Sequence, residues 1–177
     1  MRLVSVNIGH PREVIYKGKT VTTGIFKEPV EGRIRLRTLN LDGDRQADLS
    51  VHGGLSKAAY AYPIEHYAYW RAEFPGMNLP WGMFGENFTT EGLREDSVNI
   101  GDRFRIGSAE VMVTEPRLPC YKLAAKSVET NTASRLLTLR GCTCGKRMMW
   151  ARSDALCRSQ PCPRAGECTL ESGSKNS

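Results

Sequence analysis

The chain has 177 residues, a net charge of +6 and a hydrophobic fraction of 40%, a combination that suits one globular domain. No apolar run reaches about 18 residues, so a transmembrane helix is excluded. The beginning of the chain meets Pro11 and charged residues too early for a signal peptide. We therefore expect a cytoplasmic protein that does not associate with a membrane.

The positive charge is distributed unevenly along the chain. Residues 1–126 contain 17 basic and 15 acidic side chains, whereas residues 127–177 contain 8 and 4. The first part is therefore nearly balanced, and this argues against a nucleic-acid duplex as partner. A basic patch in it would have to be local, and would suit a small anion better.

Short strands dominate the predicted structure of the first half. Alternation of apolar and polar residues predicts strands at residues 2–8, 19–30 and 32–41. The polar, glycine-containing segment 42–54 is predicted to be an irregular connection.

The next segments add a helix and more strands. Residues 57–74 begin as a strand, break at Pro63 and continue as a helix with this proline in its first turn. Residues 78–93 read as a loop carrying aromatic side chains, and residues 96–119 contain two strands joined by a tight turn at Gly107. Many short strands and few helices predict a mixed β-rich (α+β) fold or a β-barrel.

The alternation ends near residue 127. From there to residue 177 the chain is rich in Arg, Cys, Ser and Thr and has no sustained period. We expect residues 1–126 to form the folded domain and residues 127–177 to be a divergent tail with little order.

One cysteine in the first part is a candidate for chemistry. Cys120 lies in the segment VTEPRLPCYKLAAK, directly after Pro119, with Arg117 three residues before it and Lys122 two residues after it. Nearby cations favour the thiolate, which is both a nucleophile and a ligand for soft metals. The alternative is an inert, buried thiol.

The other five cysteines crowd the tail. Their spacings fit a zinc knuckle poorly, and the tail contains no histidine that would complete a mixed site. Six cysteines could form three disulfides in a secreted protein, but a cytosolic protein keeps them reduced. The five are Cys142, Cys144, Cys157, Cys162 and Cys168.

Two further motifs are ambiguous when taken alone. In GDRQADLSVHGG, His52 precedes two glycines, and Asp48 and Asp44 lie four and eight residues before it. The glycines indicate a turn or a close approach of the backbone to a bound group, and a lone histidine is more often structural. The segment FGENFTTEGL resembles a phosphate cradle only weakly, because it lacks the lysine and the spacing of a P-loop.

Taken together, GDRQADLSVHGGLSKAAYAYP, FGENFTTEGL and VNIGDRFRIGSAEVMVTEPRLPCYKL resemble the MOSC domain family, named after the C-terminal domain of molybdenum cofactor sulfurases. The closer similarity is to its small stand-alone bacterial members, and it covers residues 1 to about 126. The resemblance implies a β-barrel of mixed class, which the atypical ending would leave incomplete. In the family a helix and further strands follow the cysteine motif, and the sequence shows no counterpart of them.

The resemblance also implies roles for individual residues. The family binds the molybdenum cofactor (molybdopterin), and its motif cysteine, the expected metal ligand, falls on Cys120. The histidine of the HGG motif falls on His52 and the acidic residue of FKEP on Glu28, and both are expected to be catalytic and to move protons. The expected ligands of the anionic cofactor are Lys27, Arg33, Arg117 and Lys122. Pyridoxal phosphate is another phosphate-bearing group that the resemblance suggests.

The activity that the resemblance implies is reduction of N-hydroxylated compounds, such as hydroxylaminopurine base analogues, to amines. A separate reductase would deliver the electrons, since no flavin or nicotinamide motif is present. A different interpretation is a cofactor-binding or sulfur-carrier module that uses Cys120 as a persulfide without turnover of its own. A third is a chain whose altered ending prevents correct folding.

Overall fold

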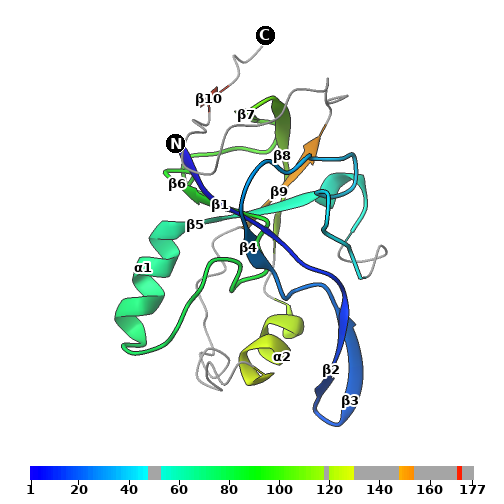
Figure 1. Ribbon diagram of the computed structural model, residues 1–177. Helices are drawn as coiled ribbons and strands as arrows, with labels where there is room; N and C mark the ends of the chain where they lie inside the picture. The colour runs from blue at the N-terminus through cyan, green and yellow to red at the C-terminus, as the bar shows by residue number, and fades with distance from the viewer. Residues whose placement is uncertain (48–52, 118–119, 130–147, 154–170, 173–177) are drawn as a thin grey trace.

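The computed structural model describes residues 1–47, 53–117, 120–129, 148–153 and 171–172, with backbone alone for residues 127–129 and for the last two ranges (Figure 1). Strands are the main element of these residues, and two α-helices and one short 3₁₀ helix accompany them. The elements are β1 (Arg2–Ile8), β2 (Arg12–Tyr16), β3 (Lys19–Thr23), β4 (Glu28–Val30), η1 (Leu55–Lys57), β5 (Ala59–Pro63), α1 (Ile64–Glu73), β6 (Phe88–Glu91), β7 (Arg103–Ile106), β8 (Ala109–Arg117), α2 (Tyr121–Glu129), β9 (Met148–Ser153) and β10 (Glu171–Ser172).

One mixed sheet joins most of the strands in the order β10-β7-β8-β9-β5-β6-β1-β4. Its pairs are antiparallel except for β5 and β6, which run parallel. Strands β2 and β3 form a separate hairpin that projects from the sheet next to helix α2 (Figure 1). The mixed β-rich class is thus confirmed, and the described strands form an open sheet rather than a closed barrel.

Apolar side chains from most strands of this sheet meet in one core. Leu3 on β1, Phe88 on β6 and Phe104 on β7 belong to it. Strand β1 continues its buried face with polar side chains, because Ser5 and Asn7 follow Leu3 at a spacing of two residues. Ser5 donates to Asn7 Oδ1 at 2.8 Å, so the buried polar atoms of this face are paired.

Several predicted elements are confirmed. Strand β1, the strand-to-helix change at Pro63 and the β7–β8 hairpin all form where the sequence predicts them. Pro63 lies one position before the helix, as its N-cap, instead of in the first turn. Its extended ψ angle of 139° explains the difference, because that conformation ends a strand.

Other predictions are wrong. Residues 32–41 do not form a strand; a single bridge between Leu36 and Leu41 closes a tight loop, held by the Arg37–Asp42 ion pair. The predicted loop 78–93 contains strand β6, and the predicted strand 19–30 is divided into β3 and β4. Strand β2 and helix α2 were not expected from the sequence.

Two strands lie beyond residue 127. Strand β9 pairs with β8 on one side and with β5 on the other, and β10 pairs with β7. The expected boundary near residue 127 stays a prediction. Within the described residues, no helix has the length and apolar character needed to cross a membrane.

Candidate functional site: a basic pocket beside helix α2

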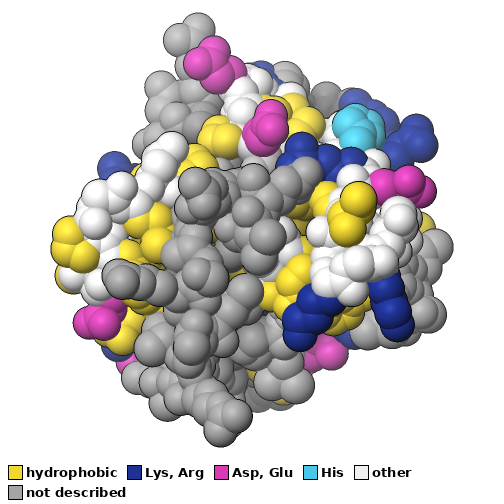
Figure 2. All heavy atoms as spheres, turned by 90° about the horizontal axis from the view of Figure 1, so that it is seen from below, with side chains coloured by type: hydrophobic (Ala, Val, Ile, Leu, Met, Phe, Trp, Pro, Cys, Tyr) yellow, Lys and Arg dark blue, Asp and Glu magenta, His cyan; other side chains and the backbone are white. Residues whose placement is uncertain are grey.

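A small pocket lies where the connection from β3 to β4, the loop before residue 48, the end of β8 and the start of α2 meet. Its cavity volume is about 60 Å³. Of the described residues that line it, five are basic and one is acidic. These charged residues are Lys27, Asp44, Arg45, Lys57, Arg117 and Lys122. Figure 2 shows Lys and Arg side chains on one side of the face seen from below, with apolar side chains beside them. The lining favours an anionic ligand.

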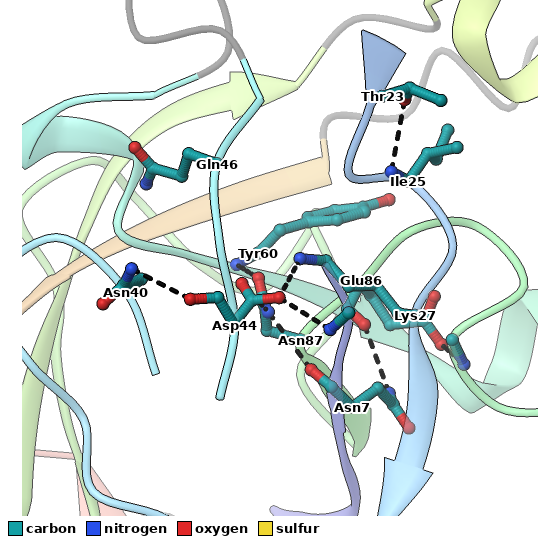
Figure 3. Close-up of polar contacts among 12 residues, drawn as sticks. Asn7, Thr23, Ile25, Lys27, Asn40, Asp44, Gln46, Tyr60, Glu86 and Asn87 are labelled. Carbon is teal, nitrogen blue, oxygen red and sulfur yellow. Dashed lines mark hydrogen bonds and ion pairs between the residues drawn. The ribbon is translucent and has the colours of Figure 1, made fainter. Parts of the chain in front are cut away.

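The most buried charged group at the pocket is an ion pair between Lys27 and Asp44 (Figure 3). Only 8% of the Lys27 side chain and 2% of the Asp44 side chain are exposed. The Gly9 amide donates to Asp44 Oδ1 at 2.8 Å, and Asn87 Nδ2 donates to Asp44 Oδ2 at 2.9 Å. Both carboxylate oxygens are therefore occupied by donors.

Opposing effects act on the Lys27 ammonium group. Burial lowers the pKa of Lys27, because it penalises the charged form. The adjacent Asp44 carboxylate opposes this decrease, whereas the positive charge of Arg117 adds to it. The protonation of Lys27 thus depends on its pairing with Asp44.

Two further cations come from elements that flank Cys120. Arg117 ends strand β8, and its guanidinium lies 4.5 Å from the ring centroid of Tyr60, a cation–π geometry that orients it. Lys122 is the second residue of α2, and only 9% of it is exposed. These two side chains are placed at the pocket by the end of a strand and the beginning of a helix.

One turn further along α2, Lys126 is also buried. Its ammonium group donates to the carbonyl oxygens of Gly82 at 2.7 Å and Ile25 at 3.3 Å. Burial lowers the pKa of Lys126 to about 8; the negative charge of Glu86 opposes the decrease, and Arg12 and Lys27 add to it. Lys126 therefore ties helix α2 to two segments at the back of the pocket.

The segment around Glu86 is structural. The Glu86 carboxylate has no exposure and accepts from the amides of Gly82 at 2.7 Å and Phe84 at 3.1 Å. It also accepts from the Tyr67 hydroxyl at 2.6 Å and the Thr89 hydroxyl at 2.9 Å. The FGENF motif is thus a loop folded around its own carboxylate, and this loop delivers Gly85 and Asn87 to the pocket.

Cys120 directly precedes α2, and its carbonyl oxygen accepts from the Leu123 amide at 2.9 Å. As a residue Cys120 is partly exposed, and its role as a metal ligand stays a prediction. It is not among the lining residues of the pocket, although Arg117 and Lys122 on either side of it are. In the part of the chain that the structure describes, no three His, Cys, Asp or Glu side chains are grouped as metal ligands.

The remaining predicted site residues fall into two groups. Glu28 and Arg33 are exposed and do not line the pocket. His52, like the five tail cysteines, lies outside the described residues. The structure therefore brings together Lys27, Arg117 and Lys122, and their role in cofactor binding stays a prediction.

Sequence reasoning missed several residues of this region. Asn87 and Lys126 were not singled out, although Lys122 and Lys126 are four residues apart, a spacing that places them on one helix face. A prediction of helix after Cys120 would have revealed this pair. Asp44 was noted only for its spacing from His52, because nothing local indicates its pairing with Lys27.

Comparisons with known proteins identify the family of the chain. The family model for the MOSC domain matches residues 48–154. The protein YflK of Bacillus subtilis (strain 168) is 48% identical over 124 residues, which is 70% of this chain and 56% of that protein. A protein named Reductase, from Gibberella moniliformis (strain M3125 / FGSC 7600), is 31% identical over 144 residues, 80% of this chain and 25% of that protein. The crystal structure of YiiM from Geobacillus stearothermophilus has a TM-score of 0.66 at 30% identity, covering 98% of this chain and 75% of that one.

The chain belongs to the MOSC domain family. Among the solved structures it is similar to YiiM, a bacterial member, so the resemblance inferred from the sequence motifs is confirmed. The chain spans about half the length of the curated relatives it matches.

Proposed function

We propose that this protein is a molybdenum-cofactor-dependent oxidoreductase that reduces N-hydroxylated compounds, such as hydroxylaminopurine base analogues, to amines in the cytoplasm. The observation that carries this proposal is the basic pocket, whose lining includes a cation on each side of Cys120. The name of one relative, Reductase, supports the class of reaction.

The side chains present suit the proposed cofactor. Lys27, Arg117 and Lys122 can hold an anionic group by charge-assisted hydrogen bonds. A volume of about 60 Å³ exceeds the roughly 10–15 Å³ that one ordered water needs, so the pocket can admit a small anionic group. This suits the phosphate end of a cofactor rather than a whole pterin. Cys120 is a partly exposed residue, and a thiolate is the right donor for a metal with sulfur ligands.

In the proposed reaction, the N–O bond of a hydroxylamine breaks, and two electrons and two protons convert it to an amine and water. When bound, the cofactor would supply the redox chemistry, with electrons from a separate reductase. Cys120 would act as a thiolate ligand and the three cations would bind the phosphate. His52 and the exposed Glu28 are the candidates for proton delivery.

The activity is tested with protein produced in cells that make the molybdenum cofactor. Purified protein, a hydroxylaminopurine and a reductase that donates electrons should give the aminopurine, and Cys120→Ser should abolish it. Cofactor-loaded protein that forms no amine with any N-hydroxylated substrate would refute the enzymatic proposal.

A second candidate function is supported by the partial exposure of Cys120. A sulfur carrier needs such a thiol, because the donor of the sulfur must reach it. In this case mass spectrometry would detect a persulfide on Cys120, and no hydroxylamine would be reduced. Turnover without persulfide would exclude this candidate.

A further inference from the structure

We propose that Asp44 is a positioning residue, which holds the Lys27 ammonium group at the wall of the basic pocket and keeps it protonated. The pocket therefore binds a dianion with a pH dependence that the Lys27–Asp44 pair sets. This inference rests on the anion-binding part of the proposed function and names a residue to which no role was assigned.

The geometry around Asp44 supports positioning. The Gly9 amide donates to one oxygen of its carboxylate. Asn87 Nδ2 donates to the other oxygen (Figure 3). Asn87 is itself held, since its Nδ2 also donates to the Asn7 carbonyl at 3.1 Å and its Oδ1 accepts from the Tyr60 amide at 3.2 Å. The carboxylate has little freedom, and it anchors Lys27 in turn.

The backbone beside this pair is equally constrained. The carbonyl oxygen of Gly9 accepts from the Arg45 amide at 3.1 Å, so Gly9 bonds to both Asp44 and the residue after it. An added Cβ at Gly9 would lie 2.0 Å from the Phe26 carbonyl oxygen. These strands and loops therefore approach closely, which keeps Asp44 next to Lys27.

Because the other charges around Lys27 are mostly positive, the protonation of Lys27 depends on Asp44. Arg117 and Lys126 act on it electrostatically, and the pocket lining adds Arg45, Lys57 and Lys122. All of these are positive and favour loss of the Lys27 proton. Two other carboxylates belong to neighbouring segments: Glu28, the next residue in the chain, is exposed, and Glu86 is engaged by its own loop. Among the described lining residues, Asp44 alone carries a negative charge.

These charges determine the direction in which loss of the Asp44 charge changes the pKa of Lys27. Asp44 raises the pKa of Lys27 against the decrease caused by burial, so removal of its charge must lower that pKa further. Lys27 would then lose its proton at a lower pH, and the pocket would lose a positive charge. When Lys27 is still protonated, the same removal takes a repulsive carboxylate away from an incoming anion.

The test uses the full chain, prepared without cofactor. The ligand is inorganic sulfate, whose charge is constant across the pH range of the measurement. Titration calorimetry compares wild type, Asp44→Asn and the matched control Asp42→Asn, which changes an exposed carboxylate. At about pH 6, Asp44→Asn should bind sulfate at least as tightly as wild type; at about pH 9 it should bind roughly tenfold more weakly. Asp42→Asn should follow wild type throughout.

A rescue variant distinguishes an Asp44 that keeps Lys27 protonated from an Asp44 that only stabilises the fold. Arginine does not deprotonate in proteins, so Lys27→Arg in the Asp44→Asn background should restore binding at high pH. Should Asp44→Asn fail to fold, Lys27→Arg alone tests the pair, because it should remove the part of the decline of sulfate affinity with pH that Lys27 causes.

Three outcomes would overturn the proposal. Asp44→Asn could lose sulfate affinity equally at all pH values, or could lose none at high pH. The third is a Lys27→Arg variant whose sulfate affinity depends on pH as in wild type. Because no cofactor or turnover is involved, these results are independent of the proposed oxidoreductase activity. Failure of that activity would leave the sulfate measurements intact.

Discussion

The Tyr67 hydroxyl donates a hydrogen bond of 2.6 Å to Oε1 of Glu86, and neither residue has any solvent exposure. The same hydroxyl oxygen accepts from the Met83 amide at 3.1 Å. Helix α1 is thereby joined to the loop that delivers Asn87 to the pocket. The position of the basic site thus depends on a hydrogen-bond network behind it.

Replacement of Tyr67 by phenylalanine tests this connection. The variant leaves the Met83 amide and a carboxylate oxygen of Glu86 with one partner fewer, so we expect a loss of about 1–3 kcal/mol in the free energy of unfolding. Urea denaturation measures the loss. Tyr69→Phe is the control, because Tyr69 is exposed on the same helix and should change stability by less than about 0.5 kcal/mol. Equal effects of the two variants would refute the account.

Lys126 predicts a pH dependence of folding stability. Its pKa is about 8 in the folded chain, against an ordinary value of 10.5. Between these two pH values the unfolded chain binds more protons at this position than the folded chain, so stability due to Lys126 rises with pH. Relative to Lys126→Met, wild type should gain up to about 3 kcal/mol across this window.

Denaturation curves at a series of pH values measure this difference. Other groups titrate in both proteins and cancel in the comparison, provided that Lys126→Met does not disturb them. Lys57→Met serves as a control of the same residue type. Parallel stability profiles of wild type and Lys126→Met between these pH values would contradict the burial of a charged ammonium group.

Arg117 is expected to contribute directly to anion binding. Removal of one charge-assisted interaction in Arg117→Ala should weaken sulfate binding by roughly tenfold or more. The effect should shrink as salt is added, because added ions screen the attraction. Arg103→Ala, on an exposed arginine paired with Glu110, is the control and should leave the affinity unchanged. Equal sulfate affinities of wild type and Arg117→Ala would show that Arg117 does not contribute to anion binding.

Two glycines with nearly the same positive φ angle allow the cost of that angle to be separated from the cost of steric crowding. Gly82 has φ +82° and Gly76 has φ +83°. A Cβ at Gly82 would lie 2.6 Å from the Lys27 carbonyl oxygen, whereas nothing lies within 4 Å at Gly76. Gly76→Ala should cost about 1–2 kcal/mol for the backbone conformation, and Gly82→Ala distinctly more. Thermal denaturation checks this ranking, and equal costs would show that the close approach is absent.

The sequence predicts the parts of the fold that local rules determine. The period of two in β1 and the proline break at Pro63 are local signals, and both elements form as expected. Strand β9 could not be predicted in this way, because it is stabilised by neighbours on both sides, β5 and β8, that are far away in the sequence. The arginine-rich alternation at 32–41 gave a wrong prediction, because residues 35–37 pair with residues 40–42 instead of with a strand of the sheet.

The site was predictable only in part. Lys27, Arg117 and Lys122 were identified through the family resemblance, and the structure places all three at one pocket. Arg33 has the same chemistry but is exposed away from that lining. Burial and pairing distinguish these positions, and a single sequence does not report either.

The most direct test of the central claim is the molybdenum content of the protein purified from cells that make the cofactor. Elemental analysis of wild type should find molybdenum close to one atom per chain, and Cys120→Ser should lose it while keeping its unfolding transition. Wild-type protein without molybdenum, or a Cys120→Ser variant that retains it, would contradict the assignment of a thiolate-held metal beside the basic pocket.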